Sequence, residues 1–220
     1  GISGNLRITV LLVLILISGI SSVAQQWYPL GPSVTTDEVK AQLGLVSALW
    51  VDKSGFNRVY AGSNTGGIFS SSDGGKNWIS VSADQVTTGV LAIEADPENE
   101  KQLYIGTGHW GFNRYYGQGV LTSPDAGSSW EKTGLGAGVI PSNGIVQELK
   151  FHLTDHNTLY ALVNTEFKGK TLIYRSPDKA KDWDIVYEMP GEELFDIVQS
   201  RDNPDLIMAT GSLLLVSRDA

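Results

Sequence analysis

Aromatic and basic side chains that could hold a ligand gather in one stretch, GTGHWGFNRYYGQG, at residues 106–119. They are His109, Trp110, Phe112, Arg114, Tyr115 and Tyr116. Exposed aromatic rings beside an arginine commonly stack on sugar rings or anchor a partner protein. The alternative is that the rings fold inward and pack a long inserted loop. Tyr115 and Tyr116 alternate across an extended chain, so we expect at least one of them to be core.

Carboxylates and histidines offer a second kind of chemistry, which the sequence makes less attractive. The stretch HLTDH puts His152 and His156 four residues apart, a spacing that suits a metal site on a helix, but we expect a strand end here. The two full octets described below supply one carboxylate each and no cluster of oxygen ligands, and the chain has no cysteine. We find no phosphate-binding loop and no nucleophile elbow. We therefore expect no metal and no cofactor.

The elements that must position these residues follow from an internal repeat. The octet SSDGGKNW (71–78) returns as SPDAGSSW (123–130) and, less completely, as SPDKAKDW (176–183). The last residues, SRDA (217–220), match the start of a fourth copy. Because the fourth copy is cut short and the chain begins without Met, we expect a fragment of a longer protein.

Each octet lies within a larger unit that reads as four strands. In phase with the octets, segments such as ALWVDKSGFNRVYAGS (48–63) and AIEADPENEKQLYIGT (92–107) show an apolar run, a polar turn and a second apolar run. A third short run precedes each octet and a fourth follows it. No segment shows sustained helical periodicity. The sequence therefore predicts an all-β fold, a partial β-propeller of about four blades, each a four-stranded antiparallel meander.

The octet resembles the Asp-box, or BNR repeat, S-x-D-x-G-x-x-W, of the sialidase, xyloglucanase and sortilin-type propeller superfamily. Similar repeats occur in photosystem II assembly propellers. The resemblance covers nearly all of the chain after residue 24, and it implies the fold more than any one function. Its structural positions here are Ser71, Asp73, Gly75 and Trp78; Ser123, Asp125, Gly127 and Trp130; Ser176, Asp178 and Trp183; and Ser217 and Asp219.

We expect the octets to be turns rather than catalytic sites. Asp73 is placed to accept backbone N–H groups ahead of it, Gly75 to adopt a positive φ, and Trp78 to bury its ring against the hairpin. In the third copy Ala180 replaces the glycine, so we expect a looser or differently shaped turn there. The segment Gln26–Leu30 resembles the strand after an octet, and we expect it to be a terminal strand that completes a blade.

Composition places the protein outside the cytoplasm and away from nucleic acid. Residues 1–24 show the basic, apolar and small-residue pattern of a cleaved secretory signal, which leaves residues 25–220 as the propeller. The apolar run is too short for a spanning helix, so we expect no membrane span after cleavage. Without cysteine, a secreted, periplasmic or cell-surface bacterial protein is the best fit. A net charge of −8 argues against a nucleic-acid partner.

The resemblance implies that an active site would lie at the end of the blades opposite the octets. In xyloglucanase-type relatives a catalytic Asp lies in a stretch similar to YAGSNTGGIF, where this chain has Asn64, which cannot act as a general base. The sialidase arginines are not visible either. We therefore favour a secreted module that binds a glycan or protein through Asn64 and the residue 109–116 cluster. A glycoside hydrolase with catalytic acids in further repeats, and an assembly-factor or receptor role, remain alternatives.

Overall fold

The computed structural model describes residues 31, 45–53, 57–82, 86, 89–109, 117–136, 138–141, 144–165 and 169–219. These residues form strands and turns and no helix, and so none that is long and apolar enough to cross a membrane. The predicted strand Gln26–Leu30 and the proposed signal segment lie outside the described residues.

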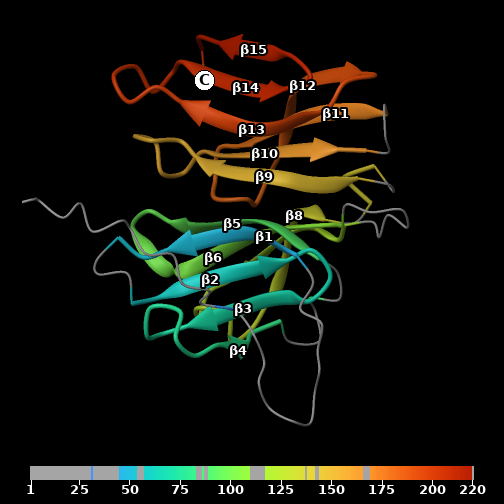
Figure 1. Cartoon of the computed structure of the whole chain (residues 1–220). Helices are drawn as coiled ribbons and strands as arrows, with labels where there is room; N and C mark the ends of the chain where they lie inside the picture. The colour runs from blue at the N-terminus through green and yellow to red at the C-terminus, as the bar shows by residue number, and fades with distance from the viewer. Residues whose placement is uncertain are drawn as a thin grey trace, which may run out of the picture.

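Four antiparallel sheets follow one another along the chain, and within each sheet the strands pair in sequence order (Figure 1). Blade 1 contains β1 (Val46–Val51), β2 (Val59–Ser63), β3 (Gly67–Ser71) and β4 (Ile79–Ser80). Blade 2 contains β5 (Val90–Asp96), β6 (Asn99–Thr107), β7 (Gly119–Ser123) and β8 (Glu131–Gly136). Blade 3 contains β9 (Ile145–Phe151), β10 (Leu159–Asn164), β11 (Lys170–Ser176) and β12 (Asp184–Pro190). Blade 4 contains β13 (Leu194–Gln199), β14 (Ile207–Gly211) and β15 (Leu214–Ser217).

This arrangement confirms the predicted β-propeller of antiparallel blades. The first strands β1, β5, β9 and β13 contact one another in that order, so they form the inner wall of the array. Each first strand carries a register shift against the second strand of its blade, close to the end away from the octet. A bulge that recurs at the same place in every blade increases strand twist and lets the inner strands fan around an axis.

The core lies between the blades rather than inside any one of them. One cluster of buried residues joins blades 1 and 2, a second joins blades 2 and 3, and a third joins blades 3 and 4. Ile68, Ile105, Leu149 and Leu162 are among the fully buried side chains of these layers. Because both faces of an inner blade are covered, its strands are apolar on both sides and the blade is stable only beside its neighbours.

Polar contacts from the second and third octets also tie blades 2 and 3 to the blade before each of them. The Tyr60 hydroxyl of blade 1 donates to the carbonyl of Ala126 in the second octet at 3.0 Å. Lys179 of the third octet pairs with Asp96 of blade 2 at 2.7 Å. Gly134 on β8 accommodates the third octet, since a Cβ there would lie 1.9 Å from the Lys181 carbonyl oxygen. The octets therefore join blades as well as turning the chain.

Candidate functional site

The octets form one repeated hydrogen-bonded turn. In all four copies the octet serine hydroxyl donates to the octet aspartate, at 2.8 Å for Ser71 and Asp73 and at 2.9 Å in the others. In the first copy Asp73 also accepts the backbone N–H groups of Lys76 and Asn77, at 3.0 and 2.9 Å. These bonds confirm the predicted role of Asp73.

The hydrogen bonds to the octet aspartates also fix their charge. The N–H groups of Asn77 lower the pKa of Asp73 to about 2, and equivalent backbone donors lower the pKa of Asp125 and Asp178. A carboxylate held in its ionised form by its own turn is a poor general acid. The geometry is that of a structural turn.

The third octet corrects one expectation. Gly75 has a φ of 88° and Gly127 a φ of 92°, as predicted for the glycine position. Ala180 adopts the same conformation with a φ of 72°, and its N–H donates to Ser176 Oγ at 2.8 Å just as the glycines donate in their copies. The prediction of a looser turn was wrong, because hydrogen bonds from both sides of Ala180 hold it in the left-handed region despite its Cβ.

The octet tryptophans differ in burial. Trp130 is buried, with 3% of its surface exposed, and its ring N–H donates to the Val81 carbonyl of blade 1 at 2.7 Å. Trp78 and Trp183 are half-buried, and each donates instead to a carbonyl of its own octet. The expected deep burial of the ring is therefore found in the second copy and not in the first.

At the opposite end of the blades, the structure brings the described residues of the predicted site together. Gly89, in the connection between blades 1 and 2, lies against Asn64 and Gly108, because a Cβ on it would be 2.1 and 2.5 Å from their carbonyl oxygens. His109 follows Gly108 directly and is half-buried. Asn64 and His109 thus flank one close backbone crossing. Of the other predicted residues, Trp110, Phe112, Arg114, Tyr115 and Tyr116 lie outside the described residues.

Both described ends of the loop that contains those aromatic residues are held in place. The N–H of Gly108 donates to the Gly89 carbonyl at 2.9 Å, and the N–H of Gly117 donates to the Gly144 carbonyl at 3.0 Å. The Thr107 hydroxyl accepts the N–H of Gln118 at 2.7 Å. The loop therefore leaves and rejoins the propeller at this end, between contacts to both neighbouring connections.

Charged residues on the inner strands form a group that sequence reasoning missed. Lys150 on β9 lies 3.6 Å from Glu94 on β5 and 3.7 Å from Glu148 on its own strand. Burial raises the pKa of Glu94, and burial, with the negative charges of Asp196 and Glu94 nearby, raises the pKa of Glu148 to about 7 although Lys150 opposes the shift. The available signal was a charged residue in the middle of an apolar first strand.

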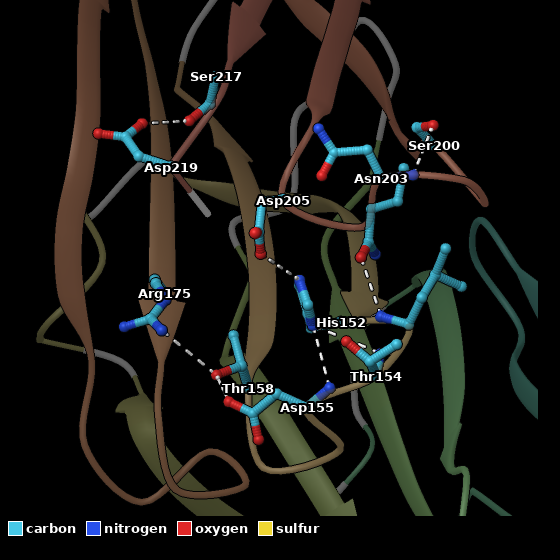
Figure 2. Close-up of polar contacts among 12 residues, drawn as sticks. His152, Thr154, Asp155, Thr158, Arg175, Ser200, Asn203, Asp205, Ser217 and Asp219 are labelled. Atoms are coloured by element: carbon cyan, nitrogen blue, oxygen red, sulfur yellow. Dashed lines mark hydrogen bonds and ion pairs between the residues drawn. The ribbon is translucent and has the colours of Figure 1, made fainter.

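The HLTDH stretch forms a turn after β9, as expected (Figure 2). Nδ1 of the buried His152 accepts the N–H of Asp155 at 3.0 Å, and its Nε2 lies 3.8 Å from Asp205 of blade 4. His156 instead lies 3.4 Å from Glu98 of blade 2. The two histidines thus have different partners, and within the described residues no three acidic or histidine side chains converge as metal ligands.

Comparisons with known proteins support the propeller fold and assign the chain to no family. No family model matches the chain, and no curated protein matches it. Among solved structures, a GH74 enzyme from Niastella koreensis has a TM-score of 0.59 at 16% identity over 79% of this chain and 28% of its own. The GH74 xyloglucanase of Xanthomonas campestris has a TM-score of 0.57 at 17% identity, over 80% and 29%.

A third structure shows how widely this architecture is shared. A chain of the COPII outer coat vertex on membranes has a TM-score of 0.53 at 10% identity, over 78% of this chain and 45% of its own. The chain spans less than a third of the length of the two GH74 proteins. Fold and neighbours together define a β-propeller module. At these identities the likeness extends to the fold alone.

Proposed function

We propose that this propeller is a secreted bacterial Asp-box (BNR) module that binds an extracellular glycan or protein at the end opposite the octets. The observation that carries the proposal is the anchoring of the aromatic loop: its start at Gly108 and its end at Gly117 are each bonded to a neighbouring connection. A loop rich in aromatic residues, held at both ends by a rigid scaffold, is a common design for recognition. The octets themselves use their serine and aspartate side chains in their own turn hydrogen bonds, so we assign the octets a structural role.

The test is a glycan array probed with the protein and with the Trp110→Ala, Tyr116→Ala double variant. We expect the double variant to lose binding at least about tenfold, the effect of removing aromatic anchors from a recognition site. Tyr187→Ala, an aromatic change on β12, serves as the matched control and should bind as the parent does. Equal binding by the parent and the double variant would remove the loop as the site.

A second candidate function, glycoside hydrolysis, is favoured by one specific observation. Glu148 has a pKa raised to about 7 by burial and by the nearby charges of Asp196 and Glu94, so a substantial fraction of it is protonated at neutral pH, as a general acid requires. The test is release of reducing sugar from xyloglucan and from aryl glycosides. Glu148→Gln should abolish any release, and no release by the parent protein rejects the hydrolase.

A further inference from the structure

One position of the inner wall holds a different kind of residue in each blade. Trp50, Glu94, Lys150 and Val198 pair with the corresponding residues of the second strands, namely Tyr60, Tyr104, Tyr160 and Met208. The four positions are equivalent in their blades. In each blade, the residue that precedes the second-strand partner pairs with the octet serine on the third strand. Blade 4 fills the position with valine. The fold therefore does not require an indole, a carboxylate or an ammonium group there.

Three of these residues line a single pocket at the octet end of the inner wall. Its volume is about 230 Å³, and Trp50, Glu94 and Lys150 line it together with Lys53, Glu100 and His156. Pockets for drug-sized ligands usually measure ~300–1,000 Å³. This one, which we call the axial pocket, suits a single ring rather than an extended chain.

The charged groups of the axial pocket retain hydrogen-bonding capacity. Lys150 Nζ lies 3.6 Å from Glu94 Oε1, beyond the ~2.7–3.2 Å of a direct hydrogen bond. The Glu94 side chain is only 20% exposed, so the carboxylate is held in a site that disfavours charge. A ligand hydroxyl placed between the two groups would donate to Glu94 and accept from Lys150, at shorter distances than the 3.6 Å that separates the two charged groups.

The aromatic member of the pocket adds an apolar surface. Trp50 packs against Tyr60 with ring centroids 5.7 Å apart at 48°, which fixes its orientation. A fixed indole beside a donor and an acceptor complements a sugar, which has an apolar ring face and hydroxyls that both donate and accept. Three carboxylates line the pocket, and one of them, Asp96, is already paired with Lys179 at 2.7 Å. The other two, Glu94 and Glu100, are balanced by Lys53 and Lys150, so the lining favours a neutral ligand over an ion.

We propose that the axial pocket binds one neutral sugar residue. This site is separate from the aromatic loop, because the pocket lies at the octet end and the loop at the other. Recognition by this protein then takes place at both ends of the blades. Each site can be removed by its own substitutions, so an experiment can reject one of the two proposals without rejecting the other.

The test uses ¹⁹F NMR of the chain labelled with 5-fluorotryptophan, with the Trp50 resonance assigned from Trp50→Phe. The probes are the methyl glycosides of glucose, galactose, mannose and xylose. We expect at least one to shift the Trp50 resonance saturably with a millimolar Kd. The Glu94→Gln, Lys150→Met double variant keeps the net charge and should weaken binding at least about tenfold.

A matched control and two further variants make the test decisive. Lys170→Met with Glu188→Gln removes another lysine–glutamate pair, formed by exposed side chains of blade 3, and should leave the Kd within about twofold. The Trp130 resonance reports that the fold is intact, and Glu94→Gln alone replaces the double variant if that resonance is lost. The proposal is overturned if no glycoside shifts Trp50, if the pocket variant binds as the parent does, or if Trp110→Ala abolishes the shift. A shift caused by glycine or inorganic phosphate and by no glycoside would also overturn it.

Discussion

Removing the ring of Trp130 tests how the blades are joined. The side chain is 3% exposed, lies in the core layer between blades 1 and 2, and donates to the Val81 carbonyl at 2.7 Å. Replacing a buried tryptophan with alanine costs about 3–5 kcal/mol, and loss of the bond to Val81 adds about 1 kcal/mol. We expect Trp130→Ala to lower the free energy of unfolding by about 4–6 kcal/mol.

The comparison with Trp78 isolates the contribution of the neighbouring blade. Trp78 occupies the same octet position but is half-buried and donates to Gly75 of its own turn, so Trp78→Ala should cost about 1–2 kcal/mol. Trp130→Phe, which keeps a ring but loses the donor, should fall between the two. Urea-induced unfolding followed by far-UV circular dichroism measures all three variants against the parent. Equal losses for Trp130→Ala and Trp78→Ala would refute the inter-blade role of the octet tryptophan.

Three further outcomes follow from the same contacts. Glu148 has a pKa raised from 4.5 to about 7, so its contribution to stability is present below pH 4.5 and is lost as the pH rises through 7. The free energy of unfolding of Glu148→Gln, measured in urea, should therefore equal that of the parent at pH 4.5 and exceed it at pH 8 by up to roughly 3 kcal/mol. Lys179→Met leaves the buried carboxylate of Asp96 without its ammonium partner and should cost about 2 kcal/mol, measured in the same way, whereas an unchanged midpoint would show that the pair is not stabilising. Gly89→Ala puts a Cβ against two backbone carbonyl oxygens and should destabilise the end of the blades opposite the octets by more than about 2 kcal/mol, while Gly136→Ala, with its nearest contact at 3.4 Å, should be close to neutral by thermal unfolding.

The turns were readable from sequence because their chemistry is local. A serine, an aspartate and a left-handed residue at fixed offsets bond to one another, and Ser71, Asp73 and Gly75 do so within five residues. Repetition of that pattern then gave the strand order and the blade architecture. The wrong prediction of a looser turn at Ala180 also came from local reasoning. It considered the low preference of alanine for a positive φ without the hydrogen bonds that impose this conformation.

The inner-wall charges and the burial of the octet rings were not readable in this way. Which neighbour a strand residue faces depends on how two blades stack, and the pairing of Lys150 with Glu94 joins residues 56 positions apart. Likewise, Trp78 and Trp130 occupy the same octet position, yet of the two only Trp130 donates to a carbonyl on the preceding blade. Such contacts are tertiary and leave no periodic signal in the chain.

The repeat itself provides a way to separate structural from functional residues. At the end of the second strands, Ser63, Thr107 and Asn164 occupy equivalent positions, and each uses its side-chain oxygen to hold a nearby backbone N–H or hydroxyl. At these positions the residue type varies, but each side chain provides an oxygen that accepts a hydrogen bond, as expected when every blade needs that bond. At the Trp50, Glu94 and Lys150 positions the chemistry itself changes from blade to blade although the packing site is the same. A residue that every blade needs for its structure should recur in every blade. The side chains at the Trp50, Glu94 and Lys150 positions do not recur, so we attribute them to a contact that differs from blade to blade. A ligand that binds asymmetrically to the inner wall makes such a contact.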